Sequence, residues 1–366
     1  MGVISEAALP PLYAVWLQAI TGGPIPAETK ATCDDCVMLA PPEKSPGAIY
    51  FEPATKCCTF QPHLPNFVAG QILGDSDSTI APARKKLEQR VSRKAAITPG
   101  WAGPGAVFSL LYRNTPNVFG RAPELRCDFL SASGECGVWK HRPGVCATWH
   151  CKHVRGEVGF RFWSLADRLL RNVEQDLSLW CMAELKTGSA EVGDMDSGAT
   201  PHISELGGEV DLARYRELWG DWLGREMDFY RACAQLVKPL TWEQVEGVCG
   251  PRVRILAGLL RDAYAHLTSE AIPERLRLCE FRISGVEGNG YRVVSYSPYD
   301  PLIMPEPLAR ALHYFDGRLT EEALEAIYKE EGVRVDLSLV RRMVDFGLLQ
   351  ACRNQKSDNS ILPVLS

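Results

Sequence analysis

Residues 127–151 read CDFLSASGECGVWKHRPGVCATWHC, a stretch in which four cysteines fall within 25 positions. An earlier group precedes it, where Cys33-Asp34-Asp35-Cys36 is followed by the adjacent pair Cys57-Cys58. Thiolates grouped in this way bind a soft metal ion or an iron–sulfur cluster, or they form disulfides. The candidate metal ligands are Cys33, Cys36, Cys57, Cys58, Cys127, Cys136, Cys146 and Cys151.

The composition favours metal ligands over disulfides. The chain has 366 residues, of which 46% are hydrophobic, and its thirteen cysteines are an odd number. Disulfide scaffolds are usually small secreted domains with an even number of cysteines. Residues 1–20 have no basic region ahead of their apolar stretch, and no apolar run of about 18 residues occurs. We therefore expect a cytoplasmic protein without a membrane span, in which clustered cysteines are ligands.

The charge pattern argues against a nucleic-acid partner. The formal net charge is −5, whereas nucleic-acid-binding domains usually present a basic face. One basic segment interleaves its charges with Leu87 and Val91, which lie four residues apart, as on an amphipathic helix. No aromatic side chains alternate with these charges as stacking platforms for bases would. We interpret as the solvated face of a helix the residues Arg84, Lys85, Lys86, Arg90, Arg93 and Lys94.

The hydrophobic pattern changes along the chain. Residues 31–160 are rich in Gly and Pro and poor in long periodic segments, as expected where metal–ligand bonds replace part of a packed core. From Phe160 onward, apolar residues recur every three or four positions, and this periodicity returns at 212–236 and 253–267. These segments predict a helical bundle. Beyond Pro273, short alternating runs flank residues 287–290, which predicts a β-hairpin.

Compact helices are expected after the hairpin. Thr320 and Asp336 are predicted to cap two of them, and Gly347 stands where a left-handed residue ends a helix. A hairpin with small helices predicts a winged-helix-like domain. The expected fold class is mainly α with small β elements. Its parts are an N-terminal segment (1–30), a metal-nucleated cysteine-rich domain (31–160), a helical bundle (161–272), a winged-helix-like domain (273–352) and a tail (353–366).

The spacing of the cysteines leaves their grouping open. Two cysteines separated by two residues reach one metal from a tight turn, whereas adjacent side chains on extended backbone point apart. Eight ligands suit two four-ligand sites or one larger cluster. His150 and His153 flank Cys151, and each is a candidate for a metal ligand, a hydrogen-bonding partner of a ligand or a structural residue. Arg142 either pairs with a carboxylate such as Glu135 or binds the cofactor by neutralising thiolate charge.

These motifs resemble the YkgJ-type cysteine-cluster family, whose members are described as zinc- or iron-chelating domains. The family pattern is Cys-x-x-Cys with a nearby Cys-Cys, then Cys-Pro-Phe-Leu, then Cys-x-Ile-Tyr-x-x-Arg-Pro-x-x-Cys. Residues 127–130 and 136–146 match the last two elements, and the resemblance covers residues 31–155. In this chain 20 residues separate Cys36 from Cys57, a longer spacing than in the family pattern.

The resemblance carries functional implications. The same family includes flagellin lysine N-methylases, which implies an iron–sulfur cluster and a role in methyl transfer. Residues 291–351 are also similar to PqqD-like winged-helix modules, which bind peptides in maturation systems. The similar positions are DPLIMPEP at 300–307, FDG at 315–317 and GLL at 347–349. This second resemblance implies a peptide or protein substrate bound by the C-terminal module.

Two functions follow from the sequence. The first is a protein with one or two iron–sulfur clusters, [4Fe–4S] favoured because the thiolate-rich ligand set requires little histidine. Such a protein would act in redox or group-transfer chemistry, such as methyl transfer or maturation, on a peptide or protein. The second is a non-enzymatic binding or adaptor protein stabilised by zinc. No catalytic residue is identified, and neither nucleic acid nor a membrane is an expected partner.

Overall fold

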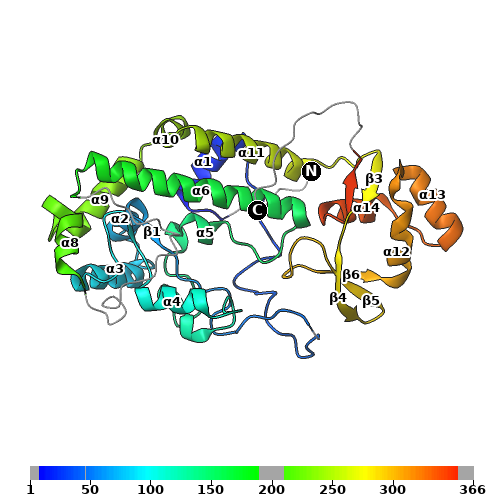
Figure 1. The fold of residues 1–366 in the computed structure, drawn as a ribbon, viewed down its shortest axis with the longest axis horizontal. Helices are drawn as coiled ribbons and strands as arrows, with labels where there is room; N and C mark the ends of the chain where they lie inside the picture. The colour runs from blue at the N-terminus through cyan, green and yellow to red at the C-terminus, as the bar shows by residue number, and fades with distance from the viewer. Residues whose placement is uncertain (1–7, 46, 189–209, 353–366) are drawn as a thin grey trace. The chain divides into compact units, whose positions relative to one another are not determined.

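The structure is a computed structural model that describes residues 8–45, 47–188 and 210–352 (Figure 1). The regular elements among these residues are helices and small antiparallel sheets, which confirms the mainly α fold class with small β elements. No helix in the described ranges is long and apolar enough to cross a membrane. The predicted tail, residues 353–366, lies outside the described residues.

The chain divides into two compact units. Among the described residues, the first unit contains 8–44, 49–151, 161–188 and 210–266, and the second contains 45, 47–48, 152–160 and 267–352. Most of the cysteine-rich segment (31–160) and of the helical segment (161–272) distinguished in the sequence belongs to the first unit. The second unit resumes at Leu267, close to the expected start of the C-terminal domain at residue 273.

Helices dominate the first unit. Its longest helix, α6, packs antiparallel to α11, because Phe162 lies 6.1 Å from Tyr264 between ring centroids and Arg252 forms an ion pair with Asp176 at 3.2 Å. The α-helices are α1 (Pro11–Thr21), α2 (Asn66–Gly74), α3 (Ala81–Arg93), α4 (Ala106–Asn114), α5 (Gly144–Ala147), α6 (Gly156–Glu184), α8 (Leu212–Trp219), α9 (Glu226–Val237), α10 (Trp242–Cys249) and α11 (Pro251–Thr268). Short 3-10 helices cover Pro123–Leu125, Trp139–His141 and Gly220–Trp222, and β1 (Leu64–Pro65) pairs with β2 (Trp101–Ala102).

The second unit contains two three-stranded antiparallel sheets. Strands β3 (Arg275–Leu278), β7 (Asp316–Leu319) and β8 (Leu349–Ala351) form one sheet in the order β7-β3-β8. Strands β4 (Arg282–Glu287), β5 (Gly290–Val294) and β6 (Leu302–Pro305) form the other in the order β4-β5-β6. The helices are α12 (Glu306–Ala311), α13 (Thr320–Glu331) and α14 (Leu337–Asp345), with a 3-10 turn at Leu312–Tyr314. The pairing of Glu287 with Gly290 confirms the hairpin.

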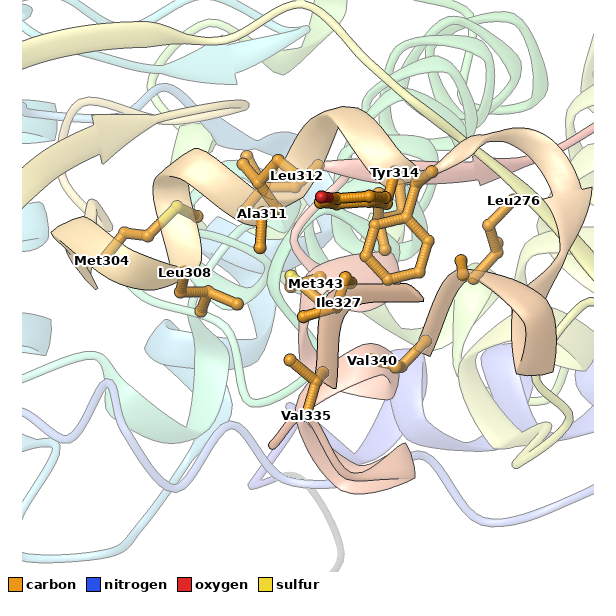
Figure 2. Packing of buried hydrophobic residues seen from close by; sticks show 14 of the residues in the cluster. Leu276, Met304, Leu308, Ala311, Leu312, Tyr314, Ile327, Val335, Val340 and Met343 are labelled. Carbon is orange, nitrogen blue, oxygen red and sulfur yellow. The ribbon is translucent and has the colours of Figure 1, made fainter. Parts of the chain in front are cut away.

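One apolar core joins the sheets and helices of the second unit (Figure 2). Leu276 comes from β3 and Met304 from β6, while Ala311, Ile327 and Met343 come from the three helices. All of these side chains are buried. Because the hydrophobic effect scales with the apolar area removed from water, this shared core stabilises the sheets and helices together.

Two of the three expected helix ends are confirmed in the second unit. The side chain of Asp336 accepts a hydrogen bond from the Leu339 amide at 2.8 Å, and Gly347 has a left-handed φ of 71°. The expectation for Thr320 is wrong. Its hydroxyl donates to the Pro273 carbonyl at 2.9 Å, and Thr320 is the first residue of α13 rather than its cap.

The contact between α2 and α9 depends on a glycine. A Cβ atom at Gly70 would lie 1.8 Å from the Tyr230 carbonyl oxygen and 2.9 Å from the Ala234 Cβ. The backbones of the two helices therefore approach so closely that no side chain fits at this position. We expect Gly70→Ala to lower the free energy of unfolding by roughly 3 kcal/mol, measured by chemical denaturation.

Gly74 on the same helix is the matched control, because a Cβ atom there would meet nothing within 4 Å. We expect Gly74→Ala to change the free energy of unfolding by less than about 1 kcal/mol. Equal effects of the two substitutions would contradict the close approach of α2 to α9.

Candidate metal centre

Backbone hydrogen bonds join the two cysteine groups of the sequence. The Cys127 amide donates to the Cys58 carbonyl at 2.8 Å. The hydroxyl of the buried Thr59 accepts from the Gly120 amide at 2.7 Å. The Cys57-Cys58 segment is therefore held against the start of the second group, although almost seventy residues separate Cys58 from Cys127.

The second group places its cysteines on a turn and a short helix. Residues 127–137 fold back on themselves, because Leu130 bridges to Cys136 and the Gly137 amide donates to the Phe129 carbonyl at 2.8 Å. Cys146 lies on α5. This arrangement brings Cys127 and Cys136 to one turn and supplies Cys146 from the segment that follows.

Basic side chains of α3 fasten this turn to the rest of the first unit. Arg90 forms an ion pair with the carboxylate of Asp128, and Lys86 donates to the Asp128 carbonyl. Arg84 donates to the carbonyl of Asp75. Lys85, Lys86 and Arg93 are exposed, as expected of a solvated helix face, whereas Arg84 and Arg90 are half-buried and bind neighbouring loops instead.

Arg142 is the buried cation of the region. Only 9% of it is exposed. Its Nε donates to the Trp139 carbonyl at 3.1 Å and its Nη2 to the Ala8 carbonyl at 2.7 Å, while its guanidinium lies 3.4 Å from the centroid of the Trp139 ring. Within the described part of the chain, Arg142 forms no ion pair with a carboxylate; Glu135 accepts from Ser133 at 3.0 Å instead.

The charges of several cysteines act on the pKa of Arg142 and on the pKa values of one another. Their mutual charge interactions define what we call the thiol group: Cys33, Cys57, Cys58, Cys127, Cys136 and Cys146. Burial is the main cause that raises the pKa of Cys127 to about 12 and that of Cys136 to about 11. Burial also raises the pKa of Cys146 well above its ordinary value. Most of these sulfurs are therefore neutral thiols in the metal-free chain.

Cys58 is the exception within the thiol group. A hydrogen bond from Cys57 is the largest cause that lowers the pKa of Cys58 to about 7, and the charges of Lys56, Arg142 and Arg126 lower it further. The expectation that adjacent thiols point apart is wrong here. Residues 55–59 form a turn rather than extended backbone, with a left-handed φ of 51° at Lys56.

The remaining sequence-predicted residues take other places. Cys36 acts on the pKa of Cys33, and Cys151 is half-buried. His150 packs with its ring centroid 4.6 Å from that of Trp163. His153 belongs to the second unit, where its amide donates to Asp300 at 3.2 Å and burial lowers the pKa of its ring to about 4.

The chemistry of the thiol group fits a soft metal ion or an iron–sulfur cluster. Thiolates are the ligands of both, and a buried guanidinium compensates the negative charge that they carry. Across residues 8–45, 47–188 and 210–352, no three His, Cys, Asp or Glu side chains form a ready-made metal site. Metal binding there would displace the protons of the thiols, because thiolates are the ligands.

Comparisons with family models, curated proteins and solved structures give no match for this chain. The motifs quoted above are the basis of the family resemblance.

Sequence reasoning missed several residues of the region. Lys56 and Arg126 lower the pKa of Cys58. In the sequence, only their positions directly before Cys57 and Cys127 could have indicated this role. Glu174 of α6 is also buried, and the sequence indicated its burial more clearly. It lies on the apolar stripe of its helix, four residues after Leu170 and three before Leu177.

The pKa values predict an order of thiol reactivity in the metal-free protein. Since the thiolate is the nucleophile, iodoacetamide should modify Cys58 at neutral pH before Cys127 and Cys136, and the rate at Cys58 should level off above pH 8. Cys57→Ala removes the hydrogen bond that stabilises the Cys58 thiolate, so its pKa should rise and its rate at pH 7 should fall roughly tenfold. Mass spectrometry of labelled peptides measures each rate.

Serine at position 57 provides the control, because its hydroxyl keeps a hydrogen-bond donor beside Cys58. We expect Cys57→Ser to retain more of the Cys58 rate than Cys57→Ala does. If both variants label Cys58 as fast as the wild type, the assigned cause of the low pKa is wrong.

Proposed function

We propose that this chain is a metal-binding protein whose eight clustered cysteines carry one or two iron–sulfur clusters, with [4Fe–4S] favoured. The observation that supports the proposal most is the burial of Arg142 among thiols, without a carboxylate partner in the described residues. Burying a cation without a counter-charge costs several kcal/mol. Thiolates that surround a metal would supply the missing negative charge.

The charge balance favours a metal-bound form. Four thiolates on one Zn²⁺ or on one [4Fe–4S]²⁺ core leave a formal charge of −2, which a neighbouring guanidinium partly neutralises. In the metal-free chain, burial instead raises the pKa values of most of these thiols and lowers that of Arg142. Both shifts disfavour the charged form: the thiolate of each cysteine and the guanidinium of Arg142.

A ligand set made of thiols supports iron–sulfur chemistry over a mixed zinc site. A bound cluster would supply redox or group-transfer chemistry on a peptide or protein, as an oxidoreductase or transferase in the cytoplasm. Its ligands would come from the eight clustered cysteines, Cys33, Cys36, Cys57, Cys58, Cys127, Cys136, Cys146 and Cys151. Trp139 would cover Arg142. The alternative is a non-enzymatic binding or adaptor protein in which zinc occupies the same thiols.

The edge of the β4-β5-β6 sheet supports a second proposal, that the C-terminal module binds an extended peptide. Strand β4 pairs only with β5 among the described strands. Ile283 and Val286 on this edge strand are 52% and 65% exposed, and they pair in register with Val293 and Tyr291 of β5. Unpaired strand edges with apolar side chains accept a further strand.

Cysteine substitutions test the metal proposal. Cys136→Ala and Cys146→Ala should each remove most of the bound metal, because each deletes a proposed ligand, whereas Cys181→Ala should leave the metal content unchanged. Cys181 is the matched control, since it is a fully buried cysteine of the same unit outside the thiol group. Elemental analysis of the purified variants measures the content. Loss of metal in Cys181→Ala with retention in Cys146→Ala would overturn this assignment.

Lysine on the edge strand tests the peptide proposal. We expect Ile283→Lys and Val286→Lys to abolish binding of peptides selected from a displayed random library, because a charge on an edge strand disfavours further pairing. Ile303→Lys on β6, where Ile303 is 47% exposed, is the control that should keep binding. Failure of the unmodified protein to enrich any peptide, or equal binding by all variants, would refute this function for β4. Fluorescence polarisation measures the affinities.

A further inference from the structure

Glu174 joins three helices of the first unit through one carboxylate oxygen. It lies on α6 and is 3% exposed, and Tyr13 of α1 is 1% exposed. The Tyr13 hydroxyl donates to Glu174 Oε1, and the Gly144 amide of α5 donates to the same oxygen at 2.6 Å. No basic residue forms an ion pair with Glu174 in the described chain. This carboxyl is therefore held by neutral donors inside the protein.

The hydrogen bond from Gly144 fixes the start of α5, which is only four residues long. The residue before it, Pro143, has no side chain that could cap the helix, so Glu174 supplies that partner from α6. A Cβ atom at Gly144 would lie 2.8 Å from the Leu170 Cβ and 3.3 Å from Glu174 Oε1. The glycine thus allows the backbone of α5 to lie directly on α6.

The same short helix carries Cys146. The Cys146 amide donates to the Pro143 carbonyl at 3.0 Å, so the placement of this thiol depends on residues 143–144. The Thr148 hydroxyl closes the other end by donating to the Gly144 carbonyl at 2.8 Å. A helix of one turn has no stability of its own, and its position must come from such tertiary contacts.

The groups that act on Glu174 come from all three helices, and the two charged ones, Asp167 and Arg171, lie on α6. Tyr13 faces it from α1 and also experiences the charge of Cys146 on α5, while Asp167 and Arg171 of α6 pair with each other at 3.1 Å. Burial raises the pKa of Glu174 to about 7. Its carboxyl oxygen accepts hydrogen bonds in either protonation state, so the contact with α5 does not require a charge.

We propose that Glu174 is a positioning residue for the thiol group: by holding the Gly144 amide, it holds α5 and the Cys146 thiol beside Arg142. The hydrogen bond between Glu174 and Gly144 and the position of α5 are properties of the chain without metal. Only the consequence for metal retention rests on the proposed metal-binding function.

Two substitutions separate the hydrogen bond from simple packing. Glu174→Gln keeps an oxygen that accepts from Gly144, whereas Glu174→Leu keeps a similar volume and has no acceptor. In the metal-free protein we expect iodoacetamide to label Cys146 roughly tenfold faster in Glu174→Leu than in the wild type, because a lost buried hydrogen bond shifts the local opening equilibrium by about that factor. Glu174→Gln should stay within about twofold of the wild type.

Cys181 on α6 provides an internal control in every sample, since it is fully buried in the same unit. Its labelling should not change. A parallel rise at Cys181 would mean that the whole unit opens, and unchanged labelling of Cys146 in Glu174→Leu would mean that Glu174 does not hold α5. Either result overturns the proposal. If Glu174→Leu does not fold, Tyr13→Phe, which removes only the hydroxyl on Glu174, should still increase labelling of Cys146 selectively.

Zinc-loaded protein tests the consequence for metal retention. Transfer of Zn²⁺ to a chromophoric chelator should be faster from Glu174→Leu than from the wild type, and Glu174→Gln should restore the wild-type rate. A wild type that takes up neither zinc nor iron would refute metal binding but leave the labelling result on Cys146 intact. Equal transfer rates from zinc-loaded wild type and Glu174→Leu would refute the role of Glu174 in metal retention.

Discussion

The buried guanidinium of Arg142 is the constraint on which the rest of this region depends. It has lost most of its hydration, and two carbonyl oxygens and the Trp139 ring satisfy it only in part. A cation placed there without an anion is unfavourable. The groups that can become anionic around it are cysteines, which explains why several loops converge on it. We infer that the stable form of the region is the one in which these sulfurs are thiolates bound to metal.

Hydrogen bonds and an ion pair tie the cysteine-bearing loops of the first unit to neighbouring segments of the chain. The amide of Cys127 binds the carbonyl of Cys58, Arg90 of α3 holds Asp128, and Glu174 of α6 holds the start of α5. Contacts of this kind fix backbone position without filling space with apolar side chains.

Sequence patterns predicted the local structure better than the long-range grouping. The hairpin at 287–290 and the roles of Asp336 and Gly347 follow from interactions within a few residues, and the structure confirms them. The prediction that Thr320 caps a helix failed because its hydroxyl donates to the carbonyl of Pro273, which is distant in the sequence. The amphipathic helix with Leu87 and Val91 on its apolar side is confirmed as α3, but Arg84 and Arg90 bind neighbouring loops rather than lying on its solvated face. Spacing along the chain could not show that Cys58 and Cys127 are neighbours, because that contact depends on how the intervening helices pack.

The central claim is that the thiol group around Arg142 holds a thiolate-bound metal centre. It is tested most directly by purifying the full chain without oxygen and measuring iron, zinc and acid-labile sulfide per chain, together with the absorption at about 400 nm. The account predicts brown protein with matched iron and sulfide, while colourless protein with zinc would support the alternative, a zinc-stabilised adaptor. Protein that contains neither iron nor zinc, and takes up neither on reconstitution, would contradict it.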